Sequence, residues 1–314
     1  MLSLISSLSL IVGHWRLNKT RLKKPTIRLL FVVPIFALDS WACLMLEASE
    51  YDLAGLLTCF REIYEAIALL SFMELVVTIL GGTEELARTL EVGAGPVEHF
   101  WPLRLVLRPY RPGAEFLAAV LAGIFQYVVA SIGFFCVVLL IWSLGRLGLP
   151  EEACRMLQAA PGFLKAVSCA WALNCLVLFA HEVRNHVPNA RLVSKFVSIK
   201  GIVFFTFWQG MAIALLDRAG ALASLEAWVA VKARRNDLRE LGWDESQIRS
   251  GLNDLLLCIE VLGFSVLHWF AYPVNEELPP PFGRRIRPDP ATPPLSFASV
   301  TNFMDVRGVL GQIA

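Results

Sequence analysis

The chain has 314 residues, of which 56% are hydrophobic and only 18% are charged, and its net charge at pH 7 is +1. Soluble domains average roughly 45–50% apolar and about 25% charged residues, so this composition excludes an ordinary soluble enzyme and a disordered chain. The balanced charge gives no reason to expect nucleic acid as a partner. We therefore predict an all-α, polytopic transmembrane helix bundle whose first partner is membrane lipid.

Candidate membrane spans follow one another along the chain as continuous apolar runs. A helix needs about 20 mostly apolar residues to cross ~30 Å of hydrocarbon. Runs of this kind occur at 26–46, 56–80, 116–145, 162–180, 199–216 and 253–272. The first apolar segment, 1–13, covers only ~20 Å as a helix, so we interpret it as the end of a helix that begins upstream. The prediction is seven spans with the first one truncated.

The loop charges predict the orientation. Loop 14–26 holds five Lys or Arg residues, whereas loop 47–55 holds three acidic residues and no basic one. Basic loops face the cytosol, which places the N-terminus outside and the C-terminus in the cytosol. Segment 217–252 is predicted external although it carries six basic residues beside six acidic ones. Its apolar part, 219–231, predicts an interfacial helix.

The last part of the chain changes composition. Residues 273–314 are rich in proline and predict a flexible cytosolic tail, with a short amphipathic helix near its end. Phe303 and Val306 fit the aromatic-x-x-aliphatic pattern that autophagy ubiquitin-like proteins bind. Chance produces such four-residue patterns in most tails, so this pair is a candidate for partner binding and no more.

Several polar side chains fall inside the apolar runs. An ionised group at bilayer depth costs at least ~2.5–3.5 kcal/mol, so each needs a partner or a function. Arg61 and Glu65 lie one helical turn apart and are expected to pair, with Tyr64 beside them. The full candidate set is Asp39, Arg61, Tyr64, Glu65, Gln209, Asn253 and Glu260.

Two interpretations of this set stay open. In the first, it lines a polar cavity where Arg61 binds the acid group of a solute, Glu65 holds Arg61 when the site is empty, and Gln209 and Asn253 add neutral hydrogen bonds. In the second, these side chains only link helices. Glu62, Lys200 and Asp254 lie near span ends, where contact with lipid headgroups explains them. Glu74 and His268 are interpreted as structural.

The sequence shows no recognisable catalytic motif. It contains no G-x-x-x-x-G-K-[ST] loop, and the seven cysteines form no CxxC pair. His181 and His186 are five residues apart, so on a helix they point about 140° away from each other, unlike zinc ligands. We expect no enzyme activity, no catalytic residues, no metal and no cofactor.

Five segments together carry a family resemblance. They are IRLLFVVPIFALDSW (27–41), FREIYEAIALLSFMELVVTILGG (60–82), GIFQYV (123–128), FVSIKGIVFFTFWQG (196–210) and NDLLLCIEVLGFSVLHWFAYP (253–273). In this order they resemble the family of organic solute transporter subunit alpha and transmembrane protein 184, which includes the plant Lazarus-type proteins. The resemblance covers about 25–275 and implies seven helices with an external N-terminus.

The resemblance implies two different functions. The alpha-subunit branch resembles a facilitative carrier for bile acids and steroid conjugates that works with a small single-span partner. The other branches resemble vacuolar or endosomal membrane proteins with trafficking, autophagy-related or receptor-like roles. Loop 81–115 lacks the cysteine cluster expected of the first branch, so the chain looks closer to the second.

The leading functional prediction is therefore a facilitative transporter of amphipathic organic anions, steroid-like or lipid-like. The alternative is a scaffold that recruits partners through its tail. Its location stays open among the plasma membrane, the vacuole and the endosome. Its oligomeric state stays open between a homo-oligomer and a hetero-oligomer.

Overall fold

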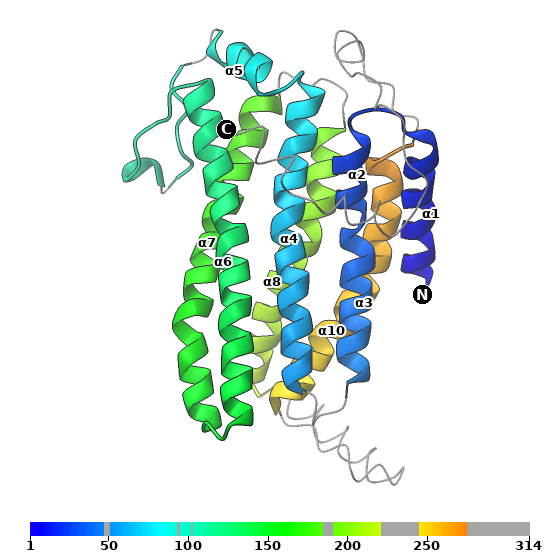
Figure 1. The fold of residues 1–314 in the computed structure, drawn as a ribbon, viewed down its shortest axis with the longest axis vertical. Coiled ribbons are helices and arrows are strands. Elements are labelled where there is room, and N and C mark those ends of the chain that lie inside the picture. Colours follow the sequence, from blue (N-terminus) through cyan, green and yellow to red (C-terminus); the bar gives the residue numbers. More distant parts are fainter. Residues whose placement is uncertain (47–50, 93–94, 102, 185–190, 221–244, 275–314) are drawn as a thin grey trace.

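The computed structural model describes residues 1–46, 51–92, 95–101, 103–184, 191–220 and 245–274. Within these ranges the chain folds into helices that run side by side along one axis (Figure 1). An isolated β-bridge joins Val97 and Tyr110, and no strand is assigned among the described residues. The expected all-α fold is confirmed.

The described helices have the following bounds in chain order. They are α1 (Leu2–Leu17), α2 (Lys23–Leu30), α3 (Val32–Met45), α4 (Tyr51–Ile79), α5 (Thr83–Glu91), the 3-10 turn η2 (Leu103–Leu105), α6 (Ala114–Arg146), α7 (Glu151–Val183), α8 (Leu192–Arg218) and α10 (Glu245–Ala271).

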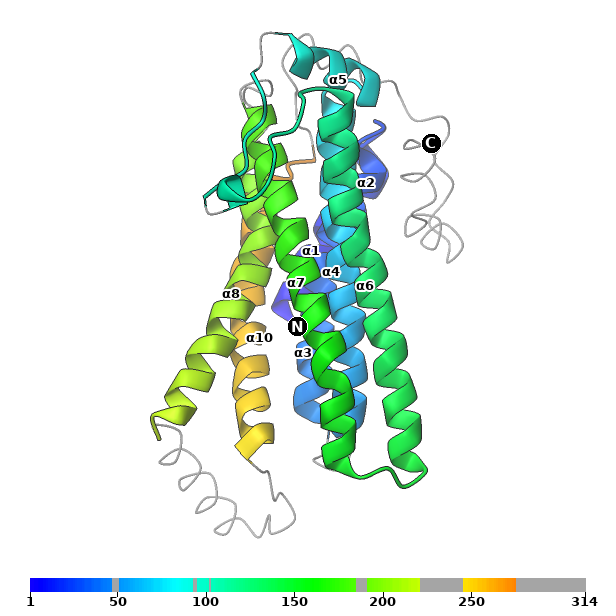
Figure 2. The ribbon, with the colours of Figure 1, turned by 90° about the vertical axis from the view of Figure 1, so that its left-hand side faces the viewer.

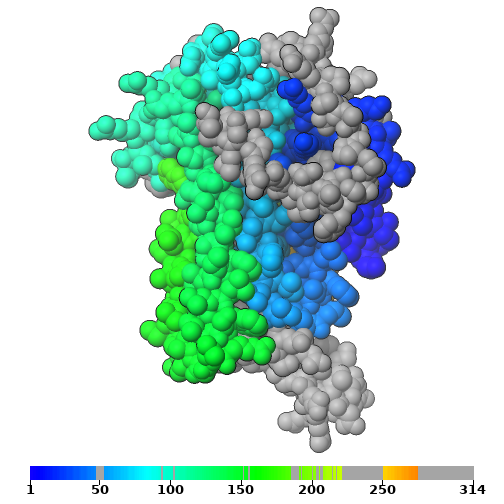
Figure 3. Space-filling model, viewed as in Figure 1, coloured from blue at the N-terminus to red at the C-terminus, as the bar shows by residue number. Residues whose placement is uncertain are grey.

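The bundle has two ends that differ in what closes them. At the α5 end, α5 lies across the helix ends, and at the α6–α7 end, α6 and α7 join through a short connection (Figures 1 and 2). α4 packs against α2, α3 and α6, while α10 packs against α1, α3 and α8. In the space-filling view α6 and α7 form one flank and α1 to α3 the other, with α4 between them (Figure 3).

Four described helical segments are long and apolar enough to cross a membrane, and a fifth is obtained if the bent pair α4 and α5 counts as one span. The four are Lys23–Met45, Ala114–Arg146, Glu152–Val183 and Ser250–Ala271. The 16 residues of α1 are apolar but shorter. The chain is thus an integral membrane protein, and the count of seven spans stays a prediction.

The expected span 26–46 is divided near its start. α2 ends at Leu30 and α3 begins at Val32, with Phe31 between them in helical backbone geometry. Pro34 explains the break, because proline has no N–H for the carbonyl four residues earlier and its ring crowds that carbonyl. The chain nevertheless continues along one path, since the backbone N–H of Ile35 still binds the Phe31 carbonyl at 3.1 Å.

The sharp turn between α4 and α5 depends on two glycines. Gly81 and Gly82 have φ angles of 94° and 104°, a region that side chains with a Cβ rarely adopt. The helix direction bends by 73° between α4 and α5. Leu86 and Leu90 on one face of α5 are buried, so α5 covers its end of the bundle as an amphipathic helix.

The expected connection 146–161 is much shorter in the structure, so its predicted bounds are wrong. α6 continues to Arg146 and α7 already begins at Glu151, so only four residues connect them. Pro161 lies inside α7. Two expected segments lie outside the described residues: most of the interfacial helix 219–231 and the tail from 275 onward. The tail includes Phe303 and Val306.

Candidate functional site

A cavity of about 570 Å³ lies among α3, α4, α6, α7, α8 and α10, in the half of the bundle toward the α6–α7 end. Its wall combines charged, polar and apolar side chains from all six helices. The lining residues used below are Cys43, Arg61, Glu62, Phe134, Val138, Lys165, Ile213, Asn253 and Asp254. This size falls within the range of small-molecule sites.

Arg61 is the central cation of the cavity. Its guanidinium Nη1 donates to Asp39 Oδ2 at 2.6 Å and lies 3.8 Å from Asp254 Oδ1. The three side chains come from α4, α3 and α10, and each is at most 13% exposed. The short contact to Asp39 is a charge-assisted hydrogen bond, whereas the contact to Asp254 is a loose ion pair.

The expected pair of Arg61 with Glu65 is wrong. Glu65 is buried one turn further along α4, but the ion pairs of Arg61 within the described chain are those with Asp39 and Asp254. The physical reason is tertiary, because α3 brings a carboxylate within direct hydrogen-bonding distance of the guanidinium. A neighbour on the same helix competes poorly with that contact, since such pairs contribute only about 0.2–0.5 kcal/mol.

Lys165 supplies a second cation to the cavity. Its Nζ donates to Glu62 Oε2 at 2.5 Å and lies 4.2 Å from the centre of the Phe134 ring. The Glu62 side chain is 28% exposed, more than any other charged group of the cavity for which an ion pair is described. Lys165 and Glu62 therefore form the most accessible charged pair in this wall.

Gln209 and Asn253 join α8 to α10 beside the cavity. Gln209 Nε2 donates to the backbone oxygen of Asn253 at 2.8 Å and to its Oδ1 at 3.1 Å. The two residues are therefore brought together, and Asn253 lines the cavity while its neighbour Asp254 contacts Arg61. Their proposed hydrogen bonds to a solute stay a prediction.

The other expected site residues lie elsewhere. Tyr64 is buried between α4 and α2, where its hydroxyl donates to the Arg28 carbonyl at 2.7 Å. Arg28 in turn pairs with Glu74 at 2.7 Å, which supports a structural role for Glu74. Glu260 is half-buried on α10 and does not line the cavity.

Sequence reasoning missed three charged residues of the cavity. Glu62 and Asp254 were assigned to the headgroup region, and Lys165 was not considered at all. One signal was available for Lys165, because it is a lysine three residues into an apolar run that was itself predicted to span the membrane. Its partner on α4 could not be identified without the helix packing.

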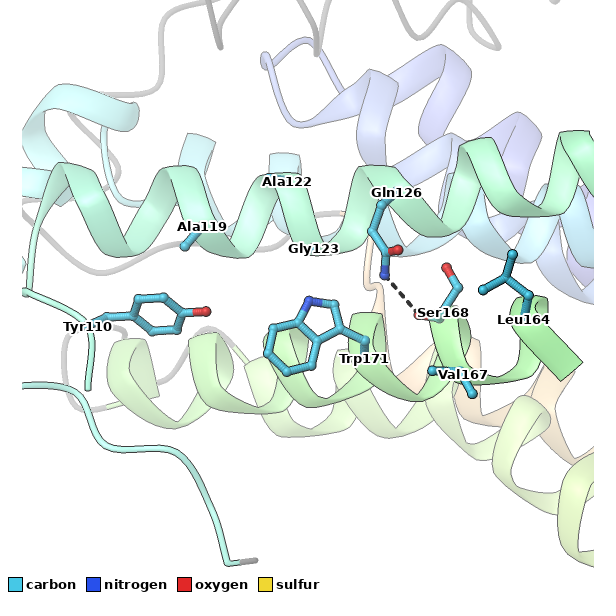
Figure 4. Close-up of a pocket in the computed structure, with 9 residues that line it drawn as sticks. All are labelled: Tyr110, Ala119, Ala122, Gly123, Gln126, Leu164, Val167, Ser168 and Trp171. Carbon is cyan, nitrogen blue, oxygen red and sulfur yellow. Dashed lines mark hydrogen bonds between the residues drawn. The ribbon is translucent and has the colours of Figure 1, made fainter. Parts of the chain in front are cut away.

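A second hollow of about 540 Å³ lies along the contact of α6 with α7 (Figure 4). Ala119, Ala122 and Gly123 form its α6 side, and Trp171 and Ser168 its α7 side. Figure 4 shows Gln126 pointing across the gap, where Nε2 donates to the Ser168 backbone oxygen at 3.2 Å. This groove carries no charged side chain, unlike the cavity.

Gly123 lets α6 and α7 approach each other closely. A Cβ at this position would lie 2.5 Å from Cys175 Sγ and 3.2 Å from Trp171 Nε1. Close approach through small residues is how helices associate in lipid, where no hydrophobic force drives them together. The small residues of the groove are thus explained by helix packing.

The family model for "Organic solute transporter Ostalpha" matches residues 1–277. Similar curated proteins from Arabidopsis thaliana are Protein LAZ1, 27% identical over 88% of this chain, LAZ1 homolog 1, 24% identical over 82%, and LAZ1 homolog 2, 29% identical over 81%. The chain spans 56%, 51% and 60% of their respective lengths. No solved structure matches significantly. The match over most of the chain shows that it belongs to the organic solute transporter Ostalpha family.

Proposed function

We propose that this chain is a facilitative transporter of amphipathic organic solutes that carry an acid group, with a steroid-like or lipid-like body. Membership of the Ostalpha family supports a transporter-like membrane protein. The names of the LAZ1 relatives specify no solute. The cavity provides the basis for the solute class.

The main support for the proposal is that the cavity combines charged and apolar surfaces within the helix bundle. Phe134, Val138 and Ile213 offer apolar area for a hydrocarbon body. Arg61 and Lys165 offer cations for an acid group in the same space. Ligand sites commonly combine a mostly apolar wall with a few convergent polar groups that fix orientation.

The ion pairs of the cavity allow a solute to bind reversibly. Asp39 and Glu62 pair with the two cations when the cavity is empty, so neither cation is left without a counter-charge inside the membrane. A solute acid group can exchange with these carboxylates, and because the exchange replaces one ion pair with another, binding does not have to be tight. In this proposal the solute moves down its own gradient.

The topology forms part of the proposal. Loop charges favour the α6–α7 end as the external end and the α5 end as the cytosolic one. The cavity then lies in the half of the protein toward the outside. The proposal has three further parts, each with its own test. They are a location in the plasma membrane, vacuole or endosome, a small single-span partner, and an oligomeric state.

The decisive experiment measures uptake of a labelled steroid sulfate and a labelled bile acid into vesicles that contain the full chain. We expect saturable uptake that Arg61→Ala abolishes while the variant still reaches the membrane. Arg28→Ala is the matched control, because Arg28 is also buried and paired with a carboxylate but lies outside the cavity. Uptake per folded molecule should persist in this control.

Folding is read separately by the membrane-inserted fraction and by size-exclusion chromatography in detergent. Normal uptake by folded Arg61→Ala would contradict the proposed site. Absence of uptake in the wild type, both alone and co-expressed with a single-span partner subunit, would contradict the proposed function.

A further inference from the structure

The charges of the cavity do not balance. Arg61 and Lys165 are its two cations, and each already has a carboxylate at hydrogen-bonding distance, Asp39 at 2.6 Å and Glu62 at 2.5 Å. Asp254 is a third carboxylate. Among the described side chains around this space, carboxylates therefore exceed cations by one.

Asp254 is the carboxylate with the weakest compensation. Its nearest described cation is Arg61 at 3.8 Å, beyond hydrogen-bonding distance, and that guanidinium is already engaged by Asp39. Asp254 also lines the cavity, whereas Asp39 does not. A ligand inside the cavity can therefore reach Asp254 directly.

A purely anionic solute fits this arrangement poorly. It would bring a further negative charge into a space where negative charge is already in excess, and it would displace a carboxylate from its cation. Charge interactions are weakly screened away from water, and breaking a buried pair without replacement is strongly unfavourable. A solute with one acid group and one cationic group adds no net charge, and its cationic group compensates Asp254 while its acid group binds a cation of the cavity.

We infer that the solute of this cavity is zwitterionic, an amphipathic molecule whose acid group binds the cationic side chains and whose ammonium group binds Asp254. The inference rests on the proposed transport function and narrows its solute class. Phe134, Val138 and Ile213 remain the surface for the hydrocarbon body.

The test compares two probes with the same sterol body. One is a cholic-acid amide that ends in a sulfonate alone, and the other is the cholic-acid amide that ends in a sulfobetaine, which adds a quaternary ammonium. Both are used at tracer concentration, far below micelle formation, with vesicles containing the wild-type chain. We expect a Vmax/KM for the zwitterion at least about tenfold above that for the anion, because one desolvated charge pair can change affinity by about this factor.

Asp254→Asn removes the charge while keeping the shape of the side chain, and it should reduce this preference to about parity. Glu260→Gln is the matched control, because it removes a carboxylate of the same helix outside the cavity, and it should keep the preference. Asp254→Glu keeps the charge and should keep most of the preference, which provides a second variant if Asp254→Asn fails to fold.

The outcomes separate the inference from the function on which it rests. Saturable uptake of the anion at equal or higher efficiency than the zwitterion overturns the inference and leaves transport standing. An unchanged preference in folded Asp254→Asn overturns the role of Asp254. No saturable uptake of either probe overturns the transport function itself.

Discussion

Two arginines of this chain form buried ion pairs with a carboxylate on a neighbouring helix. Arg28 on α2 pairs with Glu74 on α4 at 2.7 Å, and Arg61 on α4 pairs with Asp39 on α3 at 2.6 Å. All four side chains are 13% exposed or less. By residue type, distance and burial the two pairs are nearly equivalent.

Their surroundings differ. Arg28 lies on α2 and Glu74 in the last turns of α4, and the Tyr64 hydroxyl donates a hydrogen bond to the Arg28 backbone oxygen. Arg61 instead lines a cavity of about 570 Å³ together with a second ion pair and the additional carboxylate Asp254. A buried ion pair in a membrane helix is thus not sufficient evidence of a binding site, and the cavity beside it makes the difference.

The largest change in stability is expected at the structural pair. Arg28→Met leaves Glu74 buried without its cation, so the free energy of unfolding should fall by about 3–5 kcal/mol. Thermal unfolding in detergent measures the change. The double variant Arg28→Met with Glu74→Gln should recover much of it, because the uncompensated charge is gone. A single variant as stable as the wild type would show that this pair is not structural.

A smaller loss is expected at the contact of α6 with α7. Gly123→Ala places a Cβ 2.5 Å from Cys175 Sγ, and overpacking of this kind costs about 1–3 kcal/mol. Gly133→Ala on the same helix is the control, because its Cβ meets no atom within 4 Å. The control should be neutral or slightly stabilising. Equal thermal stabilities of the two variants would contradict the close packing described at Gly123.

Tyr64→Phe tests whether Tyr64 serves the structural contact between α4 and α2. Loss of the 2.7 Å hydrogen bond to the Arg28 carbonyl should lower the free energy of unfolding by about 0.5–1.5 kcal/mol. Solute uptake per folded molecule should not change, because Tyr64 does not line the cavity. A large rise in the KM for uptake with unchanged stability would return Tyr64 to the binding site.

The last comparison concerns Lys165. Its pair with Glu62 is more exposed than the pair of Arg28 with Glu74, so Lys165→Met should lower the free energy of unfolding less than Arg28→Met does. Uptake should nevertheless weaken, since one of the two cations for the acid group is lost. Thermal unfolding and uptake measured on the same preparation separate the two effects. Wild-type KM and Vmax in this variant would remove Lys165 from the site.

Much of the fold could be predicted because long apolar runs dictate helices in a membrane. The runs at 116–145 and 253–272 coincide closely with α6 and the apolar part of α10. The ends of α7 could not be predicted as well, because Glu151, Glu152 and Pro161 resemble a loop by composition although the backbone continues as a helix. Local composition does not report where a helix extends beyond the apolar layer.

The candidate site was predictable only in part. The cost of a charge in the membrane pointed to Asp39 and Arg61, and the structure pairs them across α3 and α4. The same rule could not identify the partner, since Glu65 was nearer along the chain and Asp39 is nearer in space. Asp254 and Glu62 were missed because nearness to a span end was taken to mean contact with headgroups, whereas the packing of α4, α7 and α10 turns both toward the cavity.

The most direct test of the cavity as the solute site uses a cysteine that is already in its wall. Cys43 lines the cavity, whereas Cys136 on α6 is exposed and outside it. The measurement is the rate of alkylation of each thiol by N-ethylmaleimide, followed by mass spectrometry of the wild-type chain with and without saturating steroid solute. We predict that the solute slows alkylation of Cys43 and leaves Cys136 unchanged. Equal rates at Cys43 with and without a solute that the chain transports would contradict the account.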